Sequence, residues 1–177
     1  MRKTIYLIAI LCLALLPMGT ASVADRQPVA LAERPDREAS DAGSSYPALI
    51  DKIFTKDGTT YVTIDYIQWY QGEEANRVFR ERERDPDMTE APDGYYIVND
   101  DPALHTYPVR ETAEVLMQIY NRSGSWEDAD LQPDERISLR KFRSLFTKND
   151  EDVMKSYPYH ITVADGKVVK IVQQFIP

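Results

Sequence analysis

The stretch of residues 48–70, "ALIDKIFTKDGTTYVTIDYIQWY", decides the fold. Two runs rich in β-branched and aromatic residues flank Asp57-Gly58. This dipeptide suits a two-residue hairpin turn, because both turn positions need positive φ. The hairpin that the turn closes has three expected pairs: Lys56 with Thr59, Phe54 with Tyr61, and Ile53 with Val62.

Residues 157–177, "YPYHITVADGKVVKIVQQFIP", predict a second hairpin around Asp165-Gly166. Its register pairs Ala164 with Lys167 and Val163 with Val168, and it places His160 opposite Ile171. Apolar residues then fall on both faces of the ribbon, with Val163, Val168 and Val172 on one and Val169 and Ile171 on the other. A ribbon that is partly buried on both faces suits a small barrel or a sheet covered by helices.

Two short helices are expected between the hairpins. Residues 73–84 carry a narrow apolar stripe, with acidic side chains at the start and basic side chains at the end, as the helix dipole favours. Pro86 ends this helix. Residues 138–148 form the second helix, with Ser138 as its N-cap.

The middle of the chain holds further strands. Residues 94–99 form one, residues 115–120 form either a strand or a helix, and residues 107–110 form a third segment that Pro108 breaks. Strands and helices do not alternate regularly, which argues against a parallel sheet. The expected fold class is therefore α+β, with a small antiparallel sheet or an open barrel of OB-like or SH3-like kind and two short helices.

Residues 1–24 have the pattern of a secretory signal peptide. A positively charged start precedes an apolar run over residues 4–19, and small residues follow at the positions that a signal peptidase reads. We expect cleavage after Ala24 or after Ala21. The run is short for a membrane span, which needs roughly 20 apolar residues, so no span is expected after cleavage. The protein is therefore expected to be secreted or extracytoplasmic.

Cys12 is the sole cysteine, and it lies inside the apolar run rather than at the cleavage point. We therefore predict that the protein is not a lipoprotein. The mature chain has no cysteine for a disulfide, a thiolate metal site or a cysteine nucleophile. Residues 25–45 are polar and without a sustained period, as in a flexible linker. Residues 46–177 then form a single domain.

The chain is acidic, with 21 basic and 29 acidic residues. Loss of the signal peptide removes two basic residues and no acid, which leaves 19 against 29 and a formal net charge of −10. Binding to nucleic acid needs a basic footprint, and so does docking on anionic lipid. The charge argues against both partners and is compatible with a cationic one.

The motifs of common catalytic and metal sites are incomplete. Residues 130–142 have acidic residues spaced as in an EF-hand loop. However, Glu135 occupies the position that needs Gly, and Lys141 occupies the position that needs the bidentate Glu. His105 and His160 are the two histidines, and neither has metal-ligand spacing. Neither a serine-nucleophile motif nor a glycine-rich phosphate loop is present. We predict no catalytic residue, no metal ligand and no cofactor.

The stretch "GYYIVNDDP", residues 94–102, combines aromatic side chains with a cluster of oxygen atoms. One interpretation is a strand that runs into a turn, since Asn and Asp bond to their own backbone and Pro102 constrains the next residue. The other is a binding surface at the strand ends, formed by aromatic and polar groups. The candidate ligand-binding residues are Trp69, Tyr95, Tyr96, Asn99, Asp100, Asp101 and His105.

Three motifs resemble those of small secreted bacterial proteins of unknown function. They are D-x-x-x-W-x-x-G-x-x-A at residues 65–75, Y-Y-I-x-N at residues 95–99, and a closing D-G-x-V hairpin at residues 165–168. The resemblance spans most of residues 46–177. It implies an extracytoplasmic bacterial protein, and it brings no activity and no catalytic residue.

These observations favour an extracytoplasmic, non-enzymatic binding or interaction module for a protein, a peptide or a cell-wall sugar. One alternative is a carboxylate-dependent hydrolase, which predicts Asp65 or Asp100 within hydrogen-bond reach of His105. The other is a calcium-stabilised structural domain, which would use residues 99–101 or residues 128–134 as ligands.

Overall fold

The computed structural model describes residues 43–84, 87–123, 125–146 and 151–177. All of them belong to one unit, Glu38–Pro177. The expected signal peptide and most of the expected linker, up to residue 42, lie outside the described residues. The first strand begins at Ser44, two residues before the expected start of the domain.

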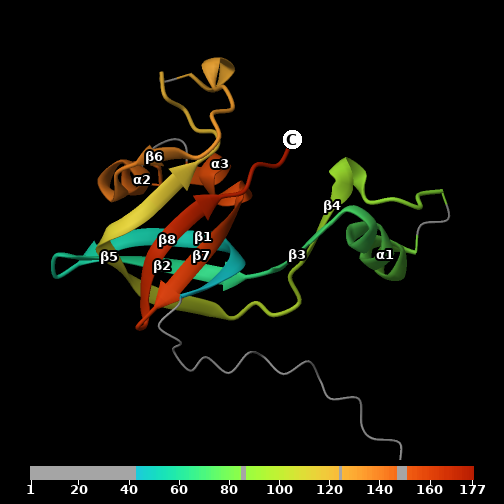
Figure 1. The fold of residues 1–177 in the computed structure, drawn as a ribbon, viewed down its shortest axis with the longest axis horizontal. Helices are drawn as coiled ribbons and strands as arrows, with labels where there is room; N and C mark the ends of the chain where they lie inside the picture. The colour runs from blue at the N-terminus through green and yellow to red at the C-terminus, as the bar shows by residue number, and fades with distance from the viewer. Residues whose placement is uncertain (1–42, 85–86, 124, 147–150) are drawn as a thin grey trace, which may run out of the picture. The chain divides into compact units, whose positions relative to one another are not determined.

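Five strands form a closed β-barrel (Figure 1). They are β1 (Ser44–Lys56), β2 (Thr59–Tyr66), β5 (Leu104–Met117), β7 (Pro158–Ala164) and β8 (Lys167–Gln173). Around the barrel the order is β1, β2, β5, β8, β7 and back to β1, and every pair is antiparallel except β5 with β8. The α+β class is confirmed. The expected open barrel is wrong, because β5 pairs with both β2 and β8 and closes it.

The first hairpin has the predicted register. Its three expected pairs all form, and Asp57 and Gly58 both have positive φ, at 50° and 77°. Ile53, Val62 and Ile64 point into the barrel and are buried. The two-residue turn thus sets which side chains of β1 and β2 enter the core.

The second hairpin matches its prediction only next to its turn. Ala164 pairs with Lys167 and Val163 with Val168. The register then shifts between Thr162 and Val163, so His160 lies opposite Val172 and not opposite Ile171. A bulge inserts an extra residue and reverses the alternation beyond it. Val168 and Ile171 are therefore both buried, although strict alternation assigned them to opposite faces.

Strand β5 is one continuous 14-residue strand, although two separate segments were expected. Pro108 lies inside it, opposite Tyr61 of β2. The pairing of β5 with β8 is irregular directly afterwards, between Val109 and Glu114. Proline lacks the N–H that a sheet ladder needs and is tolerated beside such irregularities. A short strand, β6 (Glu135–Ile137), pairs with the end of β5.

Three α-helices occur among the described residues, where two were expected. Helix α2 (Leu139–Leu145) begins as predicted at Ser138, whose side chain accepts a hydrogen bond from the Lys141 N–H. The third helix is α3 (Glu151–Ser156). Helices α2 and α3 insert Phe142, Phe146 and Met154 into the main core, next to the buried Tyr159. A short 3-10 turn, η2 (Trp126–Asp128), lies in the loop before β6.

Residues 67–103, between β2 and β5, form a separate piece that we call the β3–β4 unit. It contains β3 (Gln68–Gln71), α1 (Gly72–Glu83), the 3-10 turn η1 (Pro92–Gly94) and β4 (Tyr95–Val98). Strands β3 and β4 pair only with each other among the described residues. The second run of β-forming residues in the stretch 48–70 is thus interrupted at Ile67, and its last part joins a different sheet.

The buried Gln173 holds the end of β5 in place. Its Oε1 accepts hydrogen bonds from the backbone N–H groups of Gln118 and Ile119, each at 2.9 Å. We expect Gln173→Leu to lower the free energy of unfolding by about 1–3 kcal/mol, because two N–H groups lose their acceptor. Urea unfolding measures this loss. The exposed Gln71→Leu should change stability little, and equal effects of the two substitutions would contradict this role.

Candidate functional site

The two strands of the β3–β4 unit form a small two-stranded sheet, and a glycine adjoins one end of each strand. Gly72, with φ of 57°, follows β3 and begins α1, and Gly94, with φ of 72°, precedes β4. Positive φ favours glycine at both places. Acidic residues occupy the first turn of α1 and basic residues its last turn, as predicted from the helix dipole. The helix ends at Glu83, one residue before the expected end.

The register of β3 and β4 assigns each aromatic side chain to a face. Tyr70 lies directly opposite Tyr96, and Tyr96 packs edge-on against Phe79 of α1 at 5.6 Å between ring centroids. These two tyrosines, with Ala75, Phe79 and Ala91, form a second small core. One face of the strand pair is therefore covered by α1.

The opposite face carries a stacked aromatic pair. Trp69 lies opposite Ile97, and Tyr95 lies opposite Gln71 on the same face. The rings of Trp69 and Tyr95 stack with centroids 4.7 Å apart and an interplanar angle of 16°. Both side chains are half-buried. Stacked aromatic rings on an accessible sheet face can bind flat or apolar ligand groups.

Asp100 is engaged by an arginine of α1. The Arg82 guanidinium donates two hydrogen bonds to its carboxylate, at 2.9 and 2.6 Å. These hydrogen bonds lower the pKa of Asp100, and the Coulombic attraction of Arg82 adds to them against the cost of desolvation. The Tyr96 hydroxyl donates to Glu83 near the same helix end, and this bond raises the pKa of Tyr96. Asp100 and Tyr96 therefore tie α1 to β4.

Asn99 and Asp101 also have local structural partners. The Asn99 Nδ2 donates to Oδ2 of Asp65 at 2.6 Å, and Asp101 Oδ1 accepts from the Ala103 N–H at 3.2 Å. The second interaction is typical of an Asp that stabilises its own turn. The structure therefore shows a strand that runs into a turn over residues 95–103, in which Asn99, Asp100 and Asp101 each have a hydrogen-bond partner. The three side chains do not converge on one point.

His105 lies away from the other candidate residues, on the barrel side. It pairs with Ile64 across β2 and β5, and its ring meets Tyr66 at 5.1 Å. Asp65 is opposite Leu104, so its side chain lies on the other face of the strand pair from His105. Among the described residues Asp65 bonds to Asn99 and Asp100 to Arg82, and neither is hydrogen-bonded to His105. The contact that the hydrolase hypothesis predicted is not formed.

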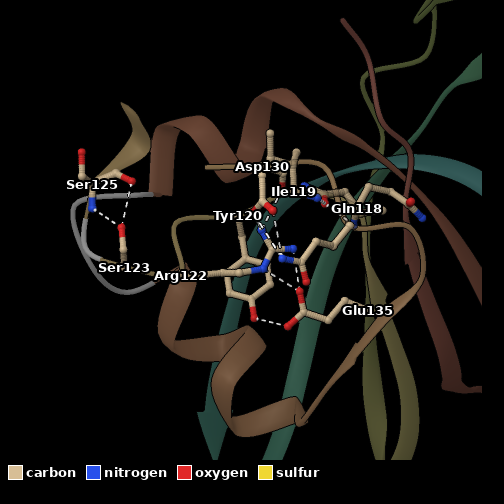
Figure 2. A network of polar contacts seen from close by, with 10 residues as sticks. Gln118, Ile119, Tyr120, Arg122, Ser123, Ser125, Asp130 and Glu135 are labelled. Atoms are coloured by element: carbon tan, nitrogen blue, oxygen red, sulfur yellow. Dashed lines mark hydrogen bonds and ion pairs between the residues drawn. The ribbon is translucent and has the colours of Figure 1, made fainter. Parts of the chain in front are cut away.

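The structure also holds a polar network that the sequence did not predict (Figure 2). Arg122 lies over the ring of Tyr120, 4.4 Å from its centroid, and donates from Nε to Glu135 at 2.6 Å. The Tyr120 hydroxyl donates to the other Glu135 oxygen at 2.7 Å. Arg122 also donates to the carbonyl oxygen of Asp130 at 2.8 Å. This network fastens the loop before β6 to the end of β5.

The acidic loop that resembled an EF-hand is part of that network. Asp130 binds Arg122 and Gln132, and Asp134 accepts from the Gln118 side chain. The side chain of Asp128, another expected calcium ligand, lies outside the described set. Within the described residues no three His, Cys, Asp or Glu side chains gather as metal ligands. In the same residues no helix is long and apolar enough to cross a membrane.

Comparison with protein-family models, with curated proteins and with solved structures finds no significant match. The resemblance to small secreted bacterial proteins stays a prediction from the three motifs. Of the seven candidate residues, the structure brings six into the β3–β4 unit and places His105 in the barrel.

Glu135 makes stability depend on pH. Burial opposes its charge, but hydrogen bonds from Tyr120 and Arg122 outweigh burial and lower its pKa below the ordinary 4.5. A lowered pKa in the folded state stabilises the fold above the unfolded pKa, and this contribution is lost as pH falls through the folded pKa. We expect Glu135→Gln to cost about 1–3 kcal/mol at pH 7.

The difference from the parent protein should shrink as pH falls from 4.5 through the lower folded-state pKa, because protonated Glu135 is then neutral like the glutamine of the variant. Urea unfolding at a series of pH values measures it. The exposed Glu111→Gln serves as the control and should cost little at any pH. A Glu135→Gln deficit that does not change with pH would contradict the charge-based role.

Proposed function

We propose that this protein is an exported, non-enzymatic binding module of OB-like architecture. In this proposal the barrel is the scaffold and the β3–β4 unit supplies the binding surface. The observation that carries the proposal is the stacked pair of Trp69 and Tyr95 on the sheet face that α1 leaves uncovered. Aromatic side chains dominate the energetics of binding surfaces, because each presents a large rigid area with a polar edge.

The OB-like assignment rests on barrel topology. The third and fifth barrel strands, β5 and β8, pair in parallel, and all other pairs are antiparallel. Helices α2 and α3 lie between the third and fourth barrel strands and pack on the core. A small closed barrel with this strand order fits an OB-like fold better than an SH3-like one. Such folds bind ligands on the barrel surface and its loops, because the barrel interior is filled by side chains.

The polar groups beside the aromatic pair support binding rather than catalysis. Asp65 accepts a hydrogen bond from Asn99 through Oδ2, and both oxygen atoms of Asp100 accept from Arg82, so the two carboxylates connect α1, β4 and β2. The buried Oδ1 of Asp65 has no hydrogen-bond partner among the described residues. If either carboxylate acted in catalysis, it would have to leave its hydrogen-bond partner, and this connection would break. The proposal includes the export signal expected at residues 1–24, which would direct the module to an extracytoplasmic compartment with peptides and cell-wall sugars as ligands.

Trp69 offers a direct optical test. The chain has two tryptophans, so Trp126→Phe leaves Trp69 as the sole one. In that background we expect the emission of Trp69 to change on titration with soluble cell-wall glycan fragments or with peptides. Tyr95→Ala should weaken such binding by about tenfold, because the stack loses one of its two rings.

The matched control is Tyr61→Ala, which removes a half-buried tyrosine stacked on Phe54 at the barrel instead. It should leave the affinity unchanged. Circular dichroism checks that both variants fold. If no ligand of either class changes the Trp69 emission, or if both substitutions weaken binding equally, the β3–β4 unit is not the binding surface.

A further inference from the structure

Strand β4 has an edge with no strand beside it in the described part of the chain. It pairs with β3 on one side, over Tyr95–Val98, and no other described element forms a backbone hydrogen bond with it. Alternate residues of an antiparallel strand direct their N–H and C=O groups toward opposite sides. Two of the four residues of β4 therefore direct these groups away from β3. Such an edge is a template for one more strand.

The sequence of β4 does little to block that pairing. The residues are Tyr-Tyr-Ile-Val, without proline or lysine, and the register with β3 runs without a shift. Proteins protect exposed edges with prolines, charged side chains, bulges and very short edge strands. Of these devices β4 has only its short length of four residues. Strand β3 begins next to the barrel, since Ile67, directly before it, donates its N–H to Pro47 of β1. We therefore consider the outer side of β4 as the edge that an added strand would use.

The net charge of the β3–β4 unit indicates which charge a partner segment at β4 should carry. Residues 67–103 contain ten acidic residues and four arginines, which gives a formal net charge of −6. Arg77 pairs with Glu74 and Glu81, and Arg82 pairs with Asp100. The exposed Asp93 lies two residues before β4. Complementary potentials favour a cationic partner, and a cation beside an aromatic ring gains further attraction.

We propose that the outer edge of β4 binds an extended, lysine- or arginine-bearing segment of a partner protein as an added third strand. This inference rests on the proposed binding function and names its partner. Main-chain hydrogen bonds to β4 supply a sequence-tolerant part of the affinity. Alternate side chains of the added strand lie beside Tyr95 on the uncovered face, where a basic group meets the aromatic pair and the acidic surroundings.

The test uses the purified protein and an acetylated, amidated hexapeptide of alternating lysine and valine. Backbone amide NMR follows residues 95–98, and the titration gives the affinity. We expect the amide signals of β4 to shift and hydrogen exchange of its two outward amides to slow. Tyr61 and its neighbours in the barrel serve as internal controls, whose signals should stay in place.

Two matched peptides separate the contribution of charge from that of main-chain hydrogen bonds. Replacing lysine by glutamate reverses the charge and keeps the strand tendency, and we expect it to weaken binding by about tenfold or more. Methylating alternate backbone nitrogens keeps the charge and removes the N–H groups, and we expect the set facing β4 to weaken binding by about tenfold as well. Equal affinity of the methylated and unmethylated peptides would overturn strand addition.

The remaining outcomes are equally decisive. If glycan fragments change the Trp69 emission and the lysine–valine peptide shifts no β4 amide at millimolar concentration, the binding function stands and the added strand does not. If the protein dimerises on its own with protected β4 amides, a second copy occupies the edge and the cationic segment is wrong. If neither peptide nor glycan affects the β3–β4 unit, both proposals fail.

Discussion

The pairing of the end of β2 with the start of β5 is the constraint on which the rest of the structure depends. Asp65 lies opposite Leu104 at the end of this pairing, and the pairing of β5 with both β2 and β8 closes the barrel. Everything between these two residues must leave the barrel and return to it at one place. The β3–β4 unit therefore has its two ends side by side, and Ile67 N–H to Pro47 and Asn99 to Asp65 join it to the barrel there. An insertion with adjacent ends costs the barrel little, because its closure entropy grows slowly with length.

Closure also explains how stability is distributed. The main core draws on all five barrel strands and on α2 and α3. The described residues of the β3–β4 unit include six buried hydrophobic side chains, those of Ile67, Ala75, Val78, Phe79, Ala91 and Val98. A helix of the length of α1 is marginal alone, so it depends on contacts such as Arg82 with Asp100. Regions with few buried contacts open more readily than cores. The surface proposed for binding thus lies on the part of the molecule with the smaller core.

The sequence predicted features that are decided locally. Asp-Gly turns, the Ser138 cap and the charge pattern of α1 each act within a few residues, and each was found where expected. Bulges are different, since nothing in the alternation near Thr162 or Val109 marks an inserted residue. The position of His160 was wrong for this reason. Among the candidate binding residues, neighbours along β3 and β4 lie together in the β3–β4 unit. The hydrogen-bond partners of Arg122 and Asp100 are 8 to 18 residues away along the chain, and a single sequence does not pair them.

The acidic side chains of "NDDP", residues 99–102, show that a cluster of acids in the sequence can resemble a metal site without forming one. Both carboxylate oxygens of Asp100 accept hydrogen bonds from Arg82, so neither is available to bind a metal ion. The same hydrogen bonds lower the pKa of Asp100. The charge pair cancels locally, yet the unit keeps a net negative charge from acids elsewhere in residues 67–103. A metal ion needs several oxygen lone pairs that converge on one point. An attractive electrostatic field for a cationic partner needs only an excess of negative charge. An acidic unit with an open strand edge therefore suits a basic chain segment better than it suits a metal ion.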